Sequence, residues 1–167
     1  FILMTQMFPS IMLLVPFYKI LSVYGLNNSL VGLCIVYVSF TIPFCSWMMV
    51  GYFRTIPTEI DESAAIDGAS HLQTFWKIAL PLVKPGLVSS AIYAFITCWN
   101  EYMFAAILLV NDKLKTAAVA IAEMNGYYKI AWNDMMAASL VASVPLIIAF
   151  VFMQKSFISG LTAGAVK

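Results

Sequence analysis

Four long apolar stretches constrain this chain more than any other feature of its sequence. They cover approximately residues 1–24, 29–53, 87–110 and 135–153. A helix needs roughly 20 mainly apolar residues to cross a hydrocarbon core of about 30 Å, whereas the strands of a membrane barrel alternate in polarity over roughly ten residues. The lengths of the stretches therefore predict an all-α membrane protein, a polytopic helical bundle with four transmembrane helices.

Prolines inside these stretches indicate how the helices associate. Pro9 and Pro16 lie in the first stretch, Pro43 in the second and Pro145 in the fourth. Within lipid, the carbonyl groups that a proline leaves free must be satisfied by neighbouring helices. We therefore expect a packed bundle of bent helices, with the first stretch kinked and ending in a tight turn at residues 25–28.

The composition excludes several classes of function. Apolar residues make up 62% of the chain and charged residues 10%, and the formal net charge is +1, so the basic excess of a nucleic-acid-binding protein is absent. The three cysteines, Cys34, Cys45 and Cys98, lie far apart in apolar stretches, and a single histidine completes no metal-ligand pattern. No phosphate-binding G-x-x-x-x-G-K-[ST] motif occurs. We expect no metal, no cofactor and no enzymatic activity.

Residues 54–85 form a polar segment between the second and third apolar stretches that is too short for an independent domain. Pro57 suits the first position of a helix. Acids that favour the positive end of the helix dipole follow it: Glu59, Asp61 and Glu62. Gly68 stands where a helix ends in a left-handed residue, so a first helix is expected to end at about Asp67.

A second helix is expected to follow directly. Ser70 and Gln73 have the spacing of a capping box. Apolar residues then recur at three-residue intervals on one face: Leu72, Phe75 and Ile78. Pro81 is expected to stop this helix. The segment is therefore predicted to be a helix–glycine–helix hairpin that projects from the bilayer, and its exposed apolar residues require a protein partner.

The spacing in this hairpin resembles a family signature. Glu62-Ser63-Ala64 is followed after three residues by Gly68 and, after nine more, by Ile78-Ala79-Leu80-Pro81. This pattern is similar to the E-A-A-x3-G-x9-I-x-L-P loop of ABC-importer permeases, with Ser63 where the family usually has alanine. Several fixed residues at set offsets over 20 positions make the match specific.

Further residues resemble the carbohydrate-importer branch of these permeases, which includes component G of the maltose permease. They lie at 67–70 (Asp-Gly-Ala-Ser), at 99–102 (Trp-Asn-Glu-Tyr) and at 160–167 (Gly-Leu-Thr-Ala-Gly-Ala-Val-Lys). The resemblance implies that residues 1–167 are one ABC-transporter transmembrane domain with a coupling loop at 54–85. It covers the last four helices of a six-helix permease, so two N-terminal spans are expected to be missing, and Phe1 indeed begins inside an apolar stretch.

The resemblance also implies a mechanism. In the family the hairpin docks in a groove of a cytoplasmic ATP-binding subunit, and ATP-driven closure of two such subunits switches the membrane helices between inward-facing and outward-facing states. The coupling residues expected from this likeness are Glu62, Ser63, Ala64, Asp67, Gly68, Ile78, Leu80 and Pro81. Glu62 would pair with a cation of the ATPase; without the surrounding spacing a solvated first-turn acid would be the better interpretation, and the spacing reverses that preference.

The same resemblance implies the partners and the location. The expected partners are an ABC ATPase subunit dimer, a second permease subunit and an extracytoplasmic solute-binding protein, together with membrane lipid. The expected location is the inner membrane of a bacterial or archaeal cell. The positive-inside rule adds little, because five basic residues lie on the hairpin side and four on the other. With the hairpin in the cytoplasm, residues 111–134 form an external loop that includes Glu123, Asn125, Tyr127 and Tyr128.

Polar residues inside the third stretch are candidates for the translocation path: Trp99, Asn100, Glu101 and Tyr102. An ionisable group within a span usually faces a cavity or a partner. Glu101 therefore either lines the path or is a paired structural residue inside the bundle, and both interpretations remain open. The two aromatic side chains would suit a neutral, hydroxyl-rich sugar, although aromatic residues also collect at membrane interfaces.

Other functions remain as alternatives. An ion-coupled secondary carrier would show internal repeats and charged residues at the midplane, but the chain has one acid in its third stretch and no repeat. An integral membrane enzyme would need a catalytic cluster, and none occurs in the sequence. Among importer substrates, glycerol phosphate and polyols remain alternatives to a sugar.

Overall fold

The computed structural model describes the backbone of residues 2–126 and 131–165, and the side chains of these residues except 2–3 and 153–165. The elements assigned in this part of the chain are all helices, so the expected all-α class is confirmed. Residues 127–130 of the expected external loop, which include Tyr127 and Tyr128, lie outside the described residues.

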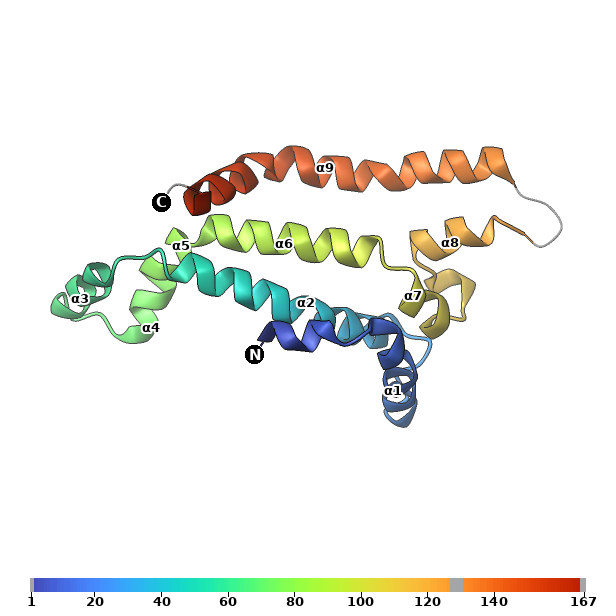
Figure 1. The fold of residues 1–167 in the computed structure, drawn as a ribbon, viewed down its shortest axis with the longest axis horizontal. Helices are drawn as coiled ribbons and strands as arrows, with labels where there is room; N and C mark the ends of the chain where they lie inside the picture. The colour runs from blue at the N-terminus through green and yellow to red at the C-terminus, as the bar shows by residue number, and fades with distance from the viewer. Residues whose placement is uncertain (1, 127–130, 166–167) are drawn as a thin grey trace.

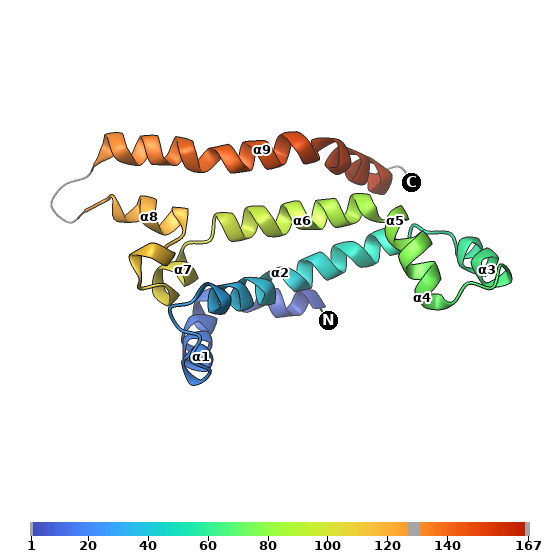
Figure 2. The same cartoon turned by 180° about the vertical axis from the view of Figure 1, so that it is seen from behind.

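Three long helices run side by side along the longest axis of the molecule (Figures 1 and 2). They are α2 (Leu30–Phe53), α6 (Lys84–Trp99) and α9 (Trp132–Ala165). α6 lies between the other two and packs against both. Pro43 lies inside α2 and Pro145 inside α9, and neither ends its helix. The expected bundle of proline-containing helices is therefore present.

By length and composition, two of the described helices can cross a membrane. They are Leu30–Phe53, with 24 residues, and Trp132–Phe152, with 21. A third span results if α6 is joined to the preceding helical segment His71–Leu82, to which it is bent by 70°. The described residues therefore give two or three spans, fewer than the four that were expected.

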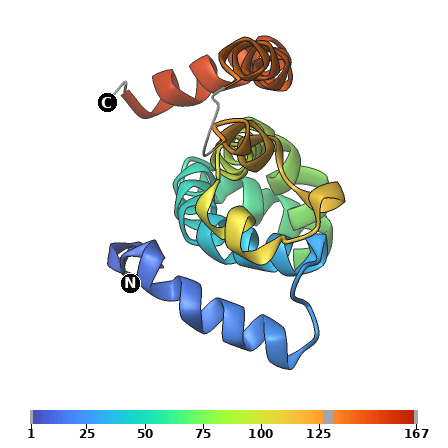
Figure 3. The ribbon, with the colours of Figure 1, turned by 90° about the vertical axis from the view of Figure 1, so that its right-hand side faces the viewer.

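The first apolar stretch accounts for the difference. It is divided into a 3-10 helix, η1 (Ile2–Met7), and a 14-residue helix, α1 (Ser10–Val23). Pro9 separates them with an extended backbone (φ −58°, ψ 121°), and a proline also disfavours helical geometry in the residue before it. α1 is too short to span and runs across the long helices (Figures 1 and 3). The expectation of one kinked span is corrected accordingly.

The turn expected after this stretch is confirmed. Gly25 has φ +66°, a conformation that costs a residue with a side chain about 1–2 kcal/mol. The Leu26 N–H donates to the Leu21 carbonyl at 2.8 Å and the Gly25 N–H to the Ser22 carbonyl at 3.1 Å. This pair of bonds is a Schellman motif, which satisfies the last carbonyl groups of α1. Ser29 then caps α2.

The third apolar stretch also differs from expectation. α6 ends at Trp99, and a short helix, α7 (Met103–Leu108), begins after a break. The Glu101 carboxylate accepts hydrogen bonds from the backbone N–H groups of Phe104 at 2.8 Å and Ala105 at 3.1 Å. A side chain thus supplies the acceptors that a continuous helix would have provided. The predicted single helix is therefore two helices with Glu101 between them.

A packed core lies at the end of the long helices where α1, α2, α7 and α8 (Ala117–Glu123) meet. A one-turn helix, η3 (Asp112–Leu114), connects α7 to α8. The buried residues of this core are Leu21, Leu33, Val36, Phe104, Ala105, Leu108, Leu109 and Val119. The rings of Phe17, Phe40 and Phe104 contact one another with centroids 4.9–6.1 Å apart. Aromatic pairs at these separations add to the free energy of burial.

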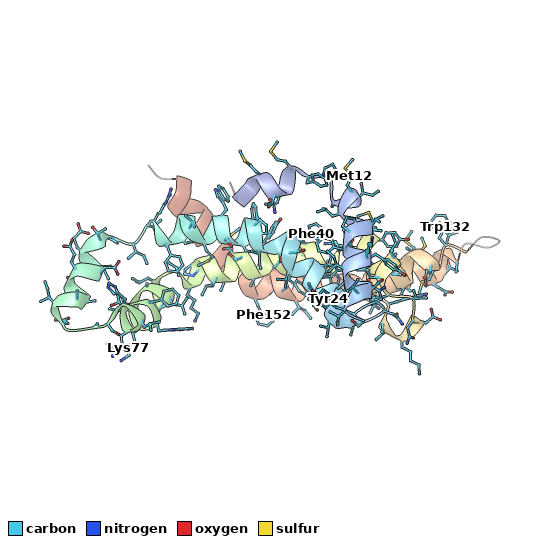
Figure 4. The ribbon with its side chains drawn as sticks, turned by 90° about the horizontal axis from the view of Figure 1, so that it is seen from below. Met12, Tyr24, Phe40, Lys77, Trp132 and Phe152 are labelled. Carbon is cyan, nitrogen blue, oxygen red and sulfur yellow. The ribbon has the colours of Figure 1, made fainter. Side chains whose placement is uncertain are left out.

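The polar segment forms a hairpin at the opposite end of the molecule (Figure 1). Its elements are α3 (Thr58–Ile66), α4 (His71–Thr74), the π-helical turn η2 (Phe75–Ala79) and α5 (Leu80–Leu82). In Figure 4, Lys77 lies at this end and Trp132 at the other. Figure 4 also shows Phe152 projecting from the outer face of α9, as expected for a side chain that faces lipid.

Candidate functional site: the polar hairpin and a cavity between helices

The first helix of the hairpin ends as the sequence predicts. α3 ends at Ile66, one residue before the expected boundary at Asp67, and Gly68 follows with φ +79°. The Ala69 N–H donates to the Ala64 carbonyl at 2.9 Å, and the Gly68 N–H donates to the carbonyl of residue 65 at 3.1 Å. These bonds form a second Schellman motif. At the start of α3, Pro57 precedes the first helical residue instead of occupying that position.

The predicted capping box is confirmed at the start of α4. The Ser70 hydroxyl accepts a hydrogen bond from the Gln73 backbone N–H at 3.4 Å, and the Ser70 N–H donates to the Gln73 side-chain oxygen at 2.9 Å. Two free N–H groups at the helix start are thereby satisfied by reciprocal contacts. Both sides of the bend are therefore held by local hydrogen bonds.

The prediction that Pro81 stops the second helix is wrong. The helical path continues through Pro81 to Leu82, and the 70° bend comes between Leu82 and Lys84. The π-helical turn explains the difference, because the Leu80 N–H donates to the carbonyl of Phe75, five residues earlier. This altered hydrogen-bond pattern comes directly before Pro81, so the missing proline N–H falls in the first turn of a new α-helical segment, where it is tolerated.

The hairpin exposes a group of large apolar side chains. Ile66 is 86% exposed, Leu72 70% and Trp76 63%. Among the residues with described side chains, one aromatic contact joins the second helix to the long helices, a stack of Phe75 on Phe53 with centroids 6.1 Å apart. Trp76 was not singled out from the sequence, because the three-residue apolar spacing does not include it. A surface of this kind is typical of a protein interface.

Four acids lie on or beside α3: Glu59, Asp61, Glu62 and Asp67. All four are exposed, and none forms an ion pair within the part of the chain that the structure describes. Ser63, the residue that departs from the family pattern, donates its hydroxyl to the Glu59 carbonyl at 2.7 Å. The hydroxyl is thus used inside the helix, so serine replaces alanine without disturbing α3. Ala64 is buried, whereas Ile78 and Leu80 are half-buried.

The base of the hairpin is positioned by a close contact between α2 and α6. A Cβ atom on Gly86 would overlap the ring of Tyr52, so only glycine lets the two helices approach this closely. The Tyr52 hydroxyl also lies 3.4 Å from the Ser89 hydroxyl. Because Tyr52 and Gly86 lie near the hairpin ends of their helices, this contact fixes both points at which the hairpin joins the bundle.

A cavity of about 560 Å³ lies between η1, α1, α2, α6 and α7. Such a volume is within the roughly 300–1,000 Å³ usual for small-molecule sites. Its polar lining includes Gln6, Tyr37, Tyr93, Thr97 and Glu101. Within the described residues, no group of three or more metal-binding side chains occurs here or elsewhere. The cavity is therefore a mixed apolar and hydroxyl-bearing space with a single acid.

Glu101 has a structural role and also lines the cavity. Its carboxylate accepts the hydroxyl of Tyr37 on α2 at 2.9 Å in addition to the two N–H groups at the start of α7. Buried carboxylates that accept several hydrogen bonds are strongly held in place. The paired structural role is therefore observed, whereas the role of Glu101 in a translocation path stays a prediction.

The structure does not bring the four candidate path residues together. The Trp99 indole N–H donates to the Ala142 carbonyl of α9 at 3.1 Å, and the Asn100 side-chain amide donates to the Ile96 carbonyl at 2.9 Å. Tyr102 is half exposed. Glu101 is the one of the four that lines the cavity. Tyr37 was missed from the sequence, since nothing local connects it to an acid 64 residues away.

A small charged cluster lies at the end opposite the hairpin. Lys115 forms ion pairs with Asp112 at 2.6 Å and Glu123 at 2.7 Å, which join η3 to α8. The hydrogen bond from Lys115 lowers the pKa of the Asp112 carboxyl, and the two carboxylates raise the pKa of the Lys115 ammonium. The cluster fixes the first half of the segment that was expected to be an external loop.

Comparison with known proteins identifies the family. The family model described as "Binding-protein-dependent transport system inner membrane component" matches residues 1–162. The chain is 40% identical to the trehalose/maltose transport system permease protein MalG of Thermococcus litoralis, over 100% of this chain and 60% of that protein. It is 39% identical to the maltodextrin transport system permease protein MdxG of Bacillus subtilis, again over 100% and 60%.

The fold also has a counterpart among solved structures. A crystal structure of a bacterial ABC transporter involved in the import of the acidic polysaccharide alginate matches with a TM-score of 0.70 and 25% identity, over 84% of this chain and 55% of that one. The chain thus spans about 60% of the length of these two curated permeases. The matched family consists of membrane components of transport systems and not of enzymes. This chain belongs to the family of binding-protein-dependent transport system inner membrane components.

Proposed function

We propose that this chain is part of the membrane-spanning permease subunit of an ATP-binding-cassette importer that carries a carbohydrate. The observation that carries the proposal is the hairpin, whose Glu62-Ser63-Ala64 to Pro81 spacing follows the family signature and whose bend at Gly68 is built by a Schellman motif. An ATPase subunit would supply the hydrolysis, because this chain has no phosphate-binding motif.

The surface of the hairpin supports an ATPase as its partner. The elements α3, α4 and η2 carry exposed apolar side chains. The acids of α3 form no ion pair with a cation within the described residues. In this proposal Glu62 meets a cation of the ATPase, Gly68 provides the bend, and the half-buried Ile78 and Leu80 connect the hairpin to α6. The hairpin then lies in the cytoplasm of a bacterial or archaeal cell.

The names of the relatives support a carbohydrate as the solute. The two permeases compared above are named for trehalose, maltose and maltodextrin, and a third relative, 34% identical, is the diacetylchitobiose uptake system permease protein DasC of Streptomyces coelicolor. The cavity, with its hydroxyl groups and Glu101, is the proposed part of the translocation path in this chain. A second permease subunit and an extracytoplasmic binding protein complete the proposed assembly.

The experiment that tests this function compares Glu62→Gln with Glu59→Gln in the complete importer. If Glu62 meets a cation across a partly buried interface, its loss leaves that cation unpaired at a cost of roughly 2–5 kcal/mol. A solvated first-turn acid would cost only about 0.3–1 kcal/mol. The measurement is sugar uptake per membrane-inserted complex, with the inserted protein quantified separately.

Glu59 is the matched control because it is an exposed acid on the same helix and lies outside the signature. We expect a selective loss of uptake for Glu62→Gln that a compensating charge change on the ATPase restores. Equal and small losses for both variants would remove Glu62 from the docking role. Reproducible ATP hydrolysis by the purified chain alone would contradict the assignment as a whole.

A further inference from the structure

We infer that the cavity beside Glu101 admits uncharged, hydroxyl-rich solutes and excludes anionic ones. The inference rests on the proposed function and narrows its substrate class. The distinction matters within this family, since the solved importer similar to this chain takes up an acidic polysaccharide, whereas the permeases named above serve neutral sugars.

The charge of the lining is the first argument. Among the described residues, Glu101 is the only carboxylic acid on the cavity wall, and no lysine, arginine or histidine lines it. The carboxylate accepts hydrogen bonds from the Tyr37 hydroxyl and from the N–H groups of Phe104 and Ala105, all of which are neutral donors. The negative charge is therefore held in place without being neutralised by a cation.

The setting of this charge is the second argument. Glu101 is half-buried where α6 gives way to α7 and lies on the wall of the cavity. An anion entering the cavity would lose hydration and meet a like charge, with no cation on the wall to compensate either cost. A phosphate, sulfonate or carboxylate group on the solute is therefore disfavoured in this space.

The remaining polar groups suit a neutral solute. The hydroxyl groups of Tyr93 and Thr97 line the cavity and have no hydrogen-bond partner among the described residues. The Gln6 side-chain amide donates to the Phe40 carbonyl at 3.3 Å, which leaves its oxygen as an acceptor. Hydroxyl groups both donate and accept, so they can match these groups without bringing a charge.

The chain carries its own reporter for a test. Cys98 lines the cavity, whereas Cys34 and Cys45 do not. We would prepare the complete importer with Cys98 as the only cysteine, and measure its rates of modification by two methanethiosulfonate reagents, one with a trimethylammonium group and one with a sulfonate. Val110→Cys, combined with Cys98→Ala, gives the reference ratio at an exposed position of the outer end.

The expected result is a cation-to-anion rate ratio at Cys98 that exceeds the reference ratio by about tenfold or more. Glu101→Gln should bring the ratio to within about twofold of the reference. Tyr37→Phe removes a hydrogen bond but keeps the charge, and should leave the ratio high. If the importer with Glu101→Gln fails to assemble, the rate ratio at Cys98 is measured at high salt instead. An ionic strength of about 1 M shortens the range of the charge to about 3 Å, so the ratio should fall.

Two labelling results would overturn the inference. One is a ratio at Cys98 equal to the reference, or high but unchanged by Glu101→Gln or by salt. The other is a Cys98 that reacts with neither reagent, because a closed cavity cannot select solutes.

An uptake assay separates this inference from the proposed function. The same importer would be given a neutral disaccharide and its phosphate monoester, and we expect uptake of the neutral sugar only. Uptake of the ester at the rate of the neutral sugar would refute the exclusion of anions and leave the importer assignment intact. If neither solute is taken up by an importer with an established binding protein, the proposed function fails, while the labelling ratio still reports the charge of the cavity.

Discussion

At the end where α1, α2, α7 and α8 meet, apolar side chains are buried against one another. At the other end, local hydrogen bonds hold the shape of the hairpin. Phe104 is 2% exposed and contacts two other rings. In the hairpin, by contrast, the bend is held by the Schellman motif at Gly68 and the capping box at Ser70, and the large apolar side chains are exposed.

The difference shows how one chain can be both a stable scaffold and a docking element. Burial within the chain stabilises the first region, and the side chains of its core contact one another instead of a partner. Local hydrogen bonds fix the shape of the hairpin without covering its side chains, so the apolar surface remains free to be buried by another protein. Four changes can break or sharpen this comparison.

Phe104→Ala is expected to have the largest effect. Removing a fully buried ring should lower the free energy of unfolding by about 3–5 kcal/mol, because contacts with Phe17 and Phe40 are lost and a cavity remains. The measurement is the thermal unfolding of the purified complex. The control is Leu72→Ala in the hairpin, which should change stability by less than about 0.5 kcal/mol when no ATPase is bound.

Gly86→Ala tests the close contact between α2 and α6 at the base of the hairpin. The added Cβ would overlap the Tyr52 ring, so α2 and α6 must move apart at a cost of about 1–3 kcal/mol. Gly51→Ala is a matched control, since Gly51 lies in α2 with open space around its missing Cβ. That change should be neutral or stabilise the helix by up to about 1 kcal/mol. Similar thermal stabilities for both variants would show that the contact is not tight.

Gly68→Ala should act on the hairpin alone. Nothing lies within 4 Å of the missing Cβ, so the cost is the left-handed conformation itself, about 1–2 kcal/mol. Hydrogen exchange of the Ala69 amide should accelerate by roughly 5–30-fold, while the thermal unfolding of the complex stays the same. Gly68→Asn should cost less, because asparagine adopts this conformation more readily. A drop in global stability would mean that the hairpin is not locally held.

The smallest expected effect concerns the Lys115 cluster and pH. Because the pKa of Asp112 is lowered, its contribution is present above the ordinary pKa of about 4 and is lost as the pH falls through the lower folded value. Because the pKa of Lys115 is raised, the contribution of Lys115 to stability is lost only as the pH rises above about 10. Amide exchange in η3, corrected for its intrinsic pH dependence, should therefore be constant from about pH 5 to 9. Asp112→Asn should remove the change at acid pH, and a persisting change would assign it to other groups.

The parts of the hairpin that could be predicted from the sequence depend on near neighbours. Ser70 and Gln73 are three residues apart, and the left-handed Gly68 lies two residues beyond the end of α3. The continuation past Pro81 could not be predicted, because it depends on a π-helical turn whose residues show no distinctive pattern. Capping signals depend on residues close in the sequence, so they do not require knowledge of the tertiary structure.

The cavity could not be predicted for the opposite reason. Glu101 was recognised as unusual because it is an acid in an apolar stretch, but its partner Tyr37 lies 64 residues away. The break between α6 and α7 was missed because apolar composition alone does not distinguish one helix from two. Trp99 and Asn100 were grouped with Glu101 by sequence, yet consecutive residues on a helix point in different directions, and here they bond to other helical carbonyls.

The π-helical turn at Phe75–Ala79 is in effect a one-residue insertion in a helix. One extra residue rotates everything that follows by about 100° around the helix axis. The turn begins within the nine residues that separate Gly68 from Ile78, so this spacing affects the direction of the helix as well as its length. Deleting Trp76 would restore an ordinary α-helical phase, and α3 with its acids would then leave the bundle in another direction.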